Sequence, residues 1–146
     1  LMICGCTFVL SVPEATFSLP EVKRGIWPMQ VMASLLPIVS ARKILEMSIT
    51  GKVYSTQEAF EMGIVTQVCE KEVIIEEAEK LTQLILSNAP YAIHLGMKAL
   101  NDLHELTESE RHPYLKDQLN ILLQSEDAKE GTSAFKEKRK PHWKGR

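Results

Sequence analysis

The sequence has few cysteines, no excess of basic side chains and no apolar run long enough to cross a bilayer. Three cysteines are an odd and small number, which excludes a disulfide framework and favours a reducing compartment. The 17 Lys and Arg side chains are outnumbered by 19 Asp and Glu side chains, so the net charge of −2 gives no general support to nucleic-acid binding. We therefore expect neither disulfides nor a nucleic-acid partner.

Charge is also missing from the start of the chain, where residues 1–13 carry none and Glu14 is the first charged side chain. This stretch is shorter than the roughly 20 residues that span a bilayer, and it lacks the basic start of a signal peptide. We expect no membrane partner and a cytoplasmic protein, with the mitochondrial matrix as the alternative in a eukaryote. An uncharged start with Leu1 in place of Met also predicts a fragment whose true N-terminus lies upstream.

Familiar catalytic and metal-binding motifs are absent as well. The chain has no GxSxG, no phosphate loop, no GxGxxG and no HExxH, and its four histidines do not have the spacing of a metal site. Cys4 and Cys6 lack a second Cys or His pair at zinc spacing, so we expect no metal and two buried structural cysteines.

The composition that is present fits one ordinary soluble domain, with 146 residues of which 45% are apolar. Its patterns predict a mostly helical chain with a few short strands. Because proline inside a helix costs roughly 3 kcal/mol, we start one helix near Pro113 and not at the possible capping pair Thr107 and Glu110. The expected strands are 15–19 and 64–68, the expected loop is 21–28, and the expected helices are 31–36, 41–49, 55–63, 73–87, 91–103, one from 113, and 127–138. Gly51 is expected to stop the second of these helices, and Ser55 with Glu58 forms a capping box for the third. An apolar face on helix 73–87 consists of Ile74, Ala78, Leu81 and Ile85.

Two features of the residues themselves suggest chemistry. Glu21 follows Pro20 at the end of an apolar strand, a setting suited to proton transfer, and a solvated loop glutamate is the alternative interpretation. The tail from Lys136 to Arg146 is rich in Lys and Arg and could clamp phosphate groups, or could simply be a solubilising run of charge.

Three stretches resemble the enoyl-CoA hydratase/isomerase (crotonase) family, in the order and spacing of that family. The first is ATFSLPEVKRG at 15–25. The second combines TG at 50–51, STQEA at 55–59 and GIV at 63–65. The third combines SEDAKEG at 125–131 with AFKEKRKP at 134–141. The resemblance covers the chain from Leu1 to Arg146.

The resemblance implies an α/β fold, and it places this chain in the C-terminal part of the crotonase (ClpP-like β-β-α spiral) fold. Residues 1–70 would complete the spiral core, and residues 71–146 would form a helical trimerisation region. Family members assemble as homo-trimers, often doubled into hexamers. They act on coenzyme A thioesters in fatty acid metabolism and need no further cofactor.

The resemblance also assigns roles to individual residues. Glu21 falls on the second catalytic glutamate, Lys138 on a basic residue that contacts the CoA nucleotide, and Leu119 on an apolar position near the adenine. Leu1 stands where hydratases place their first catalytic glutamate, so that carboxylate is missing. Trp27 replaces smaller residues beside the acyl group and predicts a short or differently shaped acyl pocket.

The resulting expectation is an enoyl-CoA hydratase, a lyase, that uses an enolate stabilised by an oxyanion hole. Both backbone donors of that hole would lie upstream of Leu1, so this fragment alone would be inactive. Two alternatives remain open. One is a Δ3,Δ2-enoyl-CoA isomerase, in which Glu21 alone moves the proton, and the other is a non-catalytic assembly module.

Overall fold

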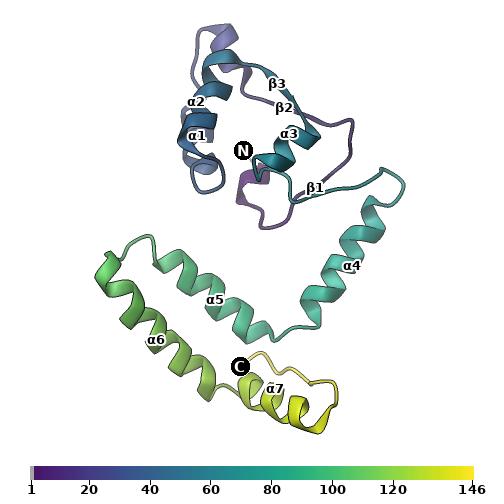
Figure 1. The fold of residues 1–146 in the computed structure, drawn as a ribbon, viewed down its shortest axis with the longest axis vertical. Coiled ribbons are helices and arrows are strands. Elements are labelled where there is room, and N and C mark those ends of the chain that lie inside the picture. The colour runs from purple at the N-terminus through teal and green to yellow at the C-terminus, as the bar shows by residue number, and fades with distance from the viewer. Residues whose placement is uncertain (1) are drawn as a thin grey trace. The chain divides into compact units, whose positions relative to one another are not determined.

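The computed structural model describes residues 2–146, and Leu1 lies outside the described residues. The chain divides into two compact units, of which the first ends at Lys80 and the second covers Leu81–Arg146. Both units are dominated by helices, and the strands are short (Figure 1). The expected boundary at residues 70 and 71 remains a prediction.

Two pairs of short strands organise the first unit. Strand β1 (Leu10–Ser11) runs parallel to β4 (Gln67–Val68), and β2 (Thr16–Ser18) runs antiparallel to β3 (Val53–Ser55). The strand predicted at 15–19 is confirmed as β2. The strand predicted at 64–68 is shorter, because the N–H groups of Ile64 and Val65 close the preceding helix on the Ala59 carbonyl.

Local sequence signals fix the helix ends of this unit. Ser40 caps the second helix by accepting the Lys43 N–H, and Gly51 ends it with φ 54°. Ser55 and Glu58 form the predicted capping box of the third helix. The predicted loop at 21–28 instead begins with a short 3-10 helix. The helices are η1 (Met2–Gly5), η2 (Pro20–Arg24), α1 (Met29–Leu35), α2 (Ala41–Thr50) and α3 (Thr56–Glu61).

A small apolar core holds these elements together. Tyr54 is its largest completely buried side chain, and it enters from β3 opposite Phe17 of β2. The buried side chains of this core are Leu19, Leu35, Val39, Ile44, Met47, Tyr54, Ala59, Ile64 and Val65. The predicted burial of Cys4 and Cys6 is wrong, because Cys4 is only half-buried at the edge of this core and Cys6 is exposed.

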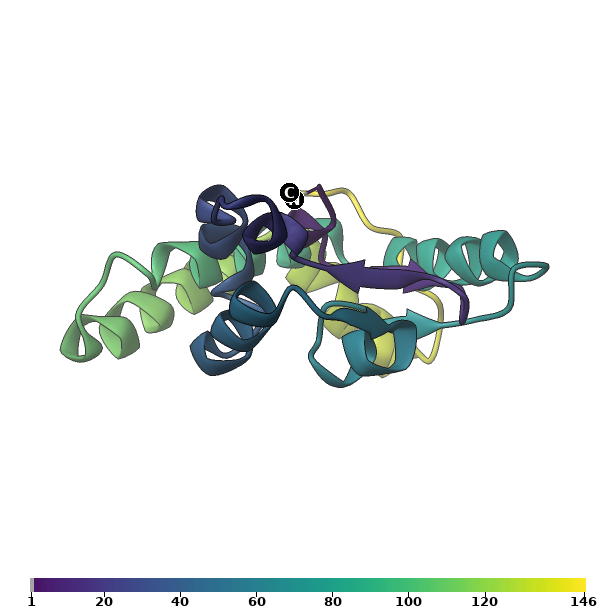
Figure 2. The ribbon, with the colours of Figure 1, turned by 90° about the horizontal axis from the view of Figure 1, so that it is seen from above.

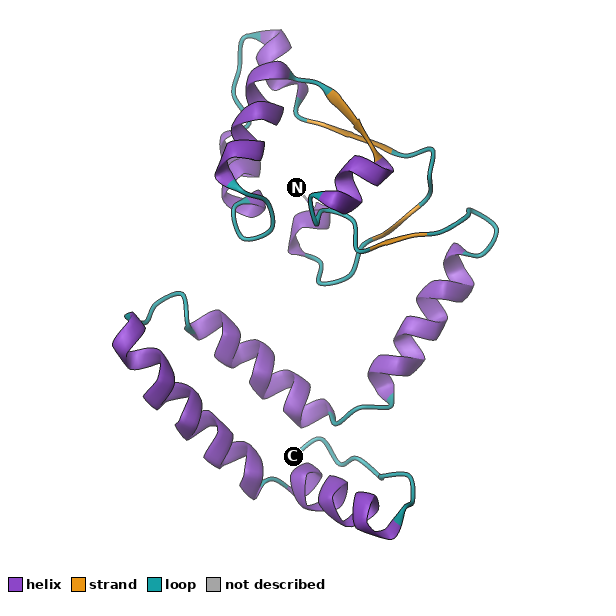
Figure 3. Cartoon of the chain, viewed as in Figure 1, coloured by secondary structure: helices purple, strands orange, loops and turns teal. Residues whose placement is uncertain are grey.

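The second unit consists of helices and an irregular tail. The division between the units falls within α4 (Ile74–Leu86), whose predicted apolar face is half-buried. Helices α5 (Pro90–Asp102) and α6 (Glu108–Gln124) lie side by side and antiparallel (Figures 1 and 2). Helix α7 (Glu126–Glu137) follows directly. Among the described residues, strands occur only in the first unit (Figure 3).

The predicted start of a helix near Pro113 is wrong, because α6 begins at Glu108 and contains this proline. The Glu110 carboxylate accepts the Thr107 N–H at 2.9 Å and the Thr107 hydroxyl at 2.5 Å, which secures the first turn. The Tyr114 hydroxyl also donates to Asp102 of α5. The cap and this contact with α5 outweigh the proline penalty.

None of the described helices combines the length and the apolar character that a membrane span requires.

Candidate functional site

Glu21 lies in the short helix η2, whose backbone conformation is fixed by the neighbouring residues. The buried Leu19 follows β2 directly, and Pro20 supplies the fixed φ that suits the first position of η2. The turn closes where the N–H of Ile26 donates to the Glu21 carbonyl at 3.3 Å and the N–H of Gly25 donates to Val22 at 3.1 Å. Glu21 is therefore held on a short rigid element, not on the free loop that the alternative interpretation requires.

Helix η2 packs against α2, and Gly51 makes this approach possible. A Cβ at Gly51 would lie 3.0 Å from Lys23 Cε and 3.3 Å from Val22 Cγ1, and the backbone there has φ 54°. A left-handed backbone combined with so close an approach favours glycine. The position of Glu21 thus depends on a residue thirty positions further along the chain.

The Glu21 carboxylate is one of two described side chains of the first unit with a buried polar atom that lacks a hydrogen-bond partner. Its Oε2 atom is buried, and no described residue forms a hydrogen bond to it; Ser48 Oγ of α2 is in the same situation. Buried polar atoms are nearly always paired, so an unpaired carboxylate oxygen needs an explanation. A role in binding a ligand or in moving a proton would explain why this oxygen has no partner within the chain.

A cavity of about 290 Å³ opens between β2, α1 and η1 in this unit. Trp27 is half-buried just before α1, and its Nε1–H donates to Met32 Sδ at 3.1 Å. Neither Trp27 nor Glu21 lines the cavity. Its lining residues are Ile3, Cys4, Thr16, Phe17, Ser18, Leu19, Val31, Leu35, Met47 and Ile64.

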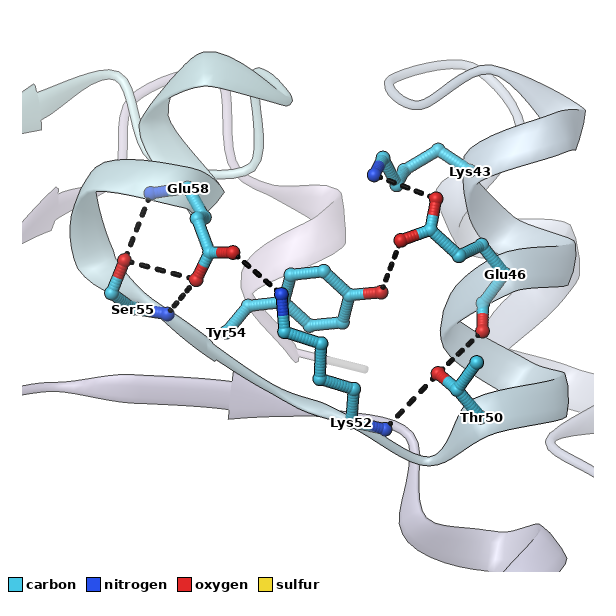
Figure 4. A network of polar contacts seen from close by, with 7 residues as sticks. All are labelled: Lys43, Glu46, Thr50, Lys52, Tyr54, Ser55 and Glu58. Carbon is cyan, nitrogen blue, oxygen red and sulfur yellow. Dashed lines mark hydrogen bonds and ion pairs between the residues drawn. The ribbon is translucent and has the colours of Figure 1, made fainter.

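A polar network stiffens α2, the helix that supports η2 (Figure 4). The buried Tyr54 donates its hydroxyl to Glu46 at 3.1 Å, and Glu46 pairs with Lys43 at 2.8 Å. Lys52 Nζ lies 4.8 Å from the centre of the Tyr54 ring and 2.9 Å from Glu58. The hydrogen bond from Lys52, together with those from Ser55, lowers the pKa of Glu58 to about 2.

The two remaining predicted site residues lie in the second unit. Leu119 is exposed on α6, with 53% of its surface accessible. Lys138 is exposed at the end of α7, where its backbone is left-handed with φ 53° and ψ 39°. It is the one non-glycine residue with positive φ in the described chain.

The tail after Lys138 turns back along α7 (Figure 1). It is held by Asp127, which is 1% exposed and accepts the N–H groups of Lys144 at 2.7 Å and Gly145 at 3.1 Å. Burial opposes the ionisation of Asp127. The N–H groups of Lys144, Gly145 and Tyr91 outweigh it, so the pKa of this carboxyl lies below its ordinary value.

Glu130 holds the first part of the same tail. Its two oxygens accept the Arg139 guanidinium at 2.6 and 3.0 Å, and one of them also accepts the His142 N–H at 2.8 Å. The Arg139 pair, followed by the His142 N–H, lowers the pKa of Glu130 to about 2. A forked pair of this kind fixes direction as well as distance.

Trp143 packs the tail onto the helices. Its ring lies against Gly131, where a Cβ would be only 3.2 Å from the ring, and its Nε1–H donates to the Ser87 carbonyl at 2.8 Å. The ring also borders an apolar cavity of about 470 Å³. The lining of this cavity includes Leu122, Leu123, Asp127, Gly131, Phe135 and Trp143.

These two sites can be set against known proteins. Residues 1–146 match the family model described as enoyl-CoA hydratase/isomerase. The chain belongs to this family. The family resemblance seen in the three sequence motifs is therefore confirmed, and so is the fold class.

Relatives of this enoyl-CoA hydratase/isomerase chain agree with the family match. Carnitinyl-CoA dehydratase from Salmonella typhi is 36% identical over 144 residues, which is 95% of this chain and 55% of that protein. The chain thus spans about half the length of the curated relatives it matches. The structure of the enoyl-CoA hydratase from Bacillus anthracis is similar, with a TM-score of 0.89 and 28% identity over 98% of this chain and 56% of that one. An enoyl-CoA hydratase/isomerase from Mycobacterium paratuberculosis gives 0.88 and 27%, over 99% and 55%.

Within this family member, the structure places the predicted residues in two separate groups. Glu21 and Trp27 belong to the first unit, and Leu119 and Lys138 belong to the second. Among the described residues, no cluster of three or more His, Cys, Asp or Glu side chains could hold a metal ion.

Sequence reasoning missed the residues that hold the tail. Asp127 and Glu130 lie a helical turn apart, and the tail that follows them carries Arg139 and Lys144. Acidic residues on a helix followed by a basic tail are a charge pattern that could have indicated a chain folding back on itself.

Proposed function

We propose that this protein acts on acyl-CoA thioesters as an enoyl-CoA hydratase, with Glu21 as its proton-transfer residue. The buried, unpaired Oε2 of Glu21 on the rigid η2 turn is the observation that carries the proposal. A carboxylate without an internal partner is free to exchange a proton with a bound substrate.

The proposed reaction is the addition of water to a 2-enoyl thioester. The Glu21 carboxylate takes a proton from water while the water oxygen bonds to C3, and the electron pair of the double bond moves to form an enolate. The protonated Glu21 then gives this proton to C2 and returns to its ionised form. The reverse reaction removes water. Relatives named as a dehydratase and as hydratases fit these two directions of one type of reaction.

An isomerase is the second candidate, and Leu1 favours it. If Leu1 occupies the position of the first glutamate of hydratases, only Glu21 remains to move protons. One carboxylate suffices to take a proton from one carbon of a dienolate and return it to another. A non-catalytic assembly module is the third hypothesis.

We also propose that the second unit contributes to CoA binding and to assembly. Lys138 would contact phosphate groups of the CoA nucleotide, and Leu119 would lie near the adenine. Exposed apolar side chains on α5, α6 and α7 support a homo-trimer or hexamer that covers them. These side chains include Met97, Leu100, Leu119, Leu123 and Phe135.

The test of the proposed reaction is Glu21→Gln in the full-length protein. Glutamine keeps the shape and the hydrogen-bonding carbonyl but cannot ionise near neutral pH. We expect thioester binding to be retained while hydration of crotonyl-CoA falls by about 10²- to 10⁴-fold. A 3-enoyl-CoA assayed in parallel distinguishes hydratase from isomerase.

Glu14→Gln is the matched control, because Glu14 is exposed and precedes Glu21 in the same segment. It should leave the rate unchanged. A Glu21→Gln protein that turns over both substrates at the wild-type rate would remove Glu21 from the mechanism and favour the assembly module.

A further inference from the structure

Lys138 adopts a backbone conformation that its side chain disfavours. It occupies the position after α7 where helices usually end on glycine, with φ 53°. The backbone bonds of this helix end are present, since the N–H of Arg139 donates to Ala134 at 3.0 Å and the N–H of Lys138 donates to Phe135 at 3.3 Å. Such strain persists only where the surrounding structure imposes it, and it occurs often at functional sites.

Glu130 links α7 to the tail that follows the turn at Lys138. It lies within α7 and grips Arg139, the residue directly after Lys138, through the forked pair. Its third bond, to the His142 N–H, brings the tail back across the helix end. Arg139 and His142, which both follow Lys138, are thus tied to a carboxylate of the helix that precedes it.

Charge pairing divides the tail cations into an engaged group and a free group. Arg139 pairs with Glu130 and Glu137, while Lys144 and Arg146 pair with Glu126. Within residues 2–146, the side chains of Lys136, Lys138 and Lys140 form no ion pair and no hydrogen bond, and all three are exposed. Of these three, Lys138 is the one that the left-handed turn holds. Its ammonium is therefore available to an external anion, whereas that of Lys144 is already engaged.

We propose that Glu130 is a positioning residue for Lys138, and that it holds the Lys138 ammonium where it meets the phosphate groups of the thioester substrate. This inference rests on the proposed function, because it takes the CoA nucleotide as the anion. Glu130 does not touch the substrate. It acts by fixing the left-handed turn through Arg139 and His142.

The experiment compares two thioesters in the full-length protein, crotonyl-CoA and crotonyl-pantetheine, of which only the first carries the nucleotide phosphates. Glu130→Ala should raise the KM for crotonyl-CoA roughly tenfold, the value of one charge-assisted contact, with kcat retained. The KM for crotonyl-pantetheine should not change. Lys138→Ala should have the same selective effect, and Lys138→Arg should restore most of the affinity.

A double variant tests whether the two residues act as one. If Glu130 works through Lys138, the Glu130→Ala, Lys138→Ala protein should be no weaker than Lys138→Ala alone. Glu126→Ala is the matched control, because Glu126 lies on the same helix and pairs with the tail but not with Arg139. It should leave both KM values unchanged. If Glu130→Ala does not fold, Glu130→Gln keeps an acceptor for His142 and should give a smaller, equally selective rise.

The contrary outcomes are distinct. Three outcomes would overturn the positioning role and leave the proposed function standing. The first is an unchanged KM in Glu130→Ala when Lys138→Ala raises the KM for crotonyl-CoA. The others are additive effects in the double variant and equal rises in KM for the two thioesters. Failure of Lys138→Ala to alter the KM would overturn both the positioning role and the proposed phosphate contact. A wild-type protein that turns over neither thioester would overturn the proposed function itself.

Discussion

Two glutamates, one in each unit, are the carboxylates most strongly stabilised in their ionised form. Glu58 is stabilised by Lys52 and Ser55, and Glu130 is stabilised by Arg139 and His142, so that the pKa of each is about 2. The ordinary value is 4.5. A depressed pKa in the folded state means that the unfolded chain takes up protons first as the pH falls.

The depressed pKa of Glu130 makes the stability of the second unit depend on pH. The stabilisation from Glu130 is complete above pH 4.5 and is lost as the pH falls toward about 2. Glu130→Gln should therefore lower the melting temperature at neutral pH and make its decline between these two pH values shallower. Thermal unfolding followed by circular dichroism across this range measures both. Glu14→Gln, which removes an exposed carboxylate without a partner, should leave the curve unchanged, and an unchanged curve for Glu130→Gln would contradict the assignment.

At the scale of elements, the contact of η2 with α2 decides where Glu21 lies. Gly51 serves this contact twice, by its left-handed backbone and by the lack of a Cβ facing Val22 and Lys23. A change at Gly51 should therefore reach Glu21 through the helix, although the two residues are far apart in the sequence.

Gly51→Ala should lower the free energy of unfolding by about 1–2 kcal/mol, the cost of a left-handed alanine. It should also reduce the hydration rate, because η2 has to shift away from α2. Denaturant unfolding measures the first effect and crotonyl-CoA turnover the second. Gly5→Ala is the control, since no atom lies within 4 Å of the added Cβ and its φ is not positive. Equal stability of the two variants would show that the contact tolerates a methyl group.

At the scale of the whole molecule, many large apolar side chains remain exposed in the second unit. Phe135 is 86% exposed, and Leu100 is 66% exposed. Soluble proteins seldom leave such surfaces open in a group, so we expect another surface to cover them.

The full-length protein should sediment as a trimer or hexamer at micromolar concentration. Phe135→Ser and Leu100→Ser together should shift it toward smaller species, while Phe8→Ser, an exposed apolar residue of the first unit, serves as the comparison. A strict monomer in analytical ultracentrifugation would contradict the assembly proposal.

Sequence patterns predicted the features of this fold that depend on neighbouring residues. The capping box of Ser55 and Glu58, the helix stop at Gly51 and the strand that leads into Pro20 each involve residues a few positions apart. The three family motifs then placed Glu21 in a known pattern, and the family is confirmed.

The features that sequence patterns missed depend on distant residues. Asp127 and Lys144 meet only because the tail turns back, and no periodicity encodes that turn. Pro113 stays inside α6 because contacts with α5 outweigh a local penalty. The short helix η2 replaces a predicted loop, since Pro20 and Gly25 happen to have the spacing of one 3-10 element.

In evolutionary terms, the left-handed backbone at residue 138 sets two selective pressures against each other. Backbone stability alone favours glycine or asparagine there, whereas contact with an anion favours lysine or arginine. Sequences in which selection no longer favours contact with an anion should change toward glycine at this position. The residue found at this position in a lineage would therefore record whether selection maintains the proposed contact.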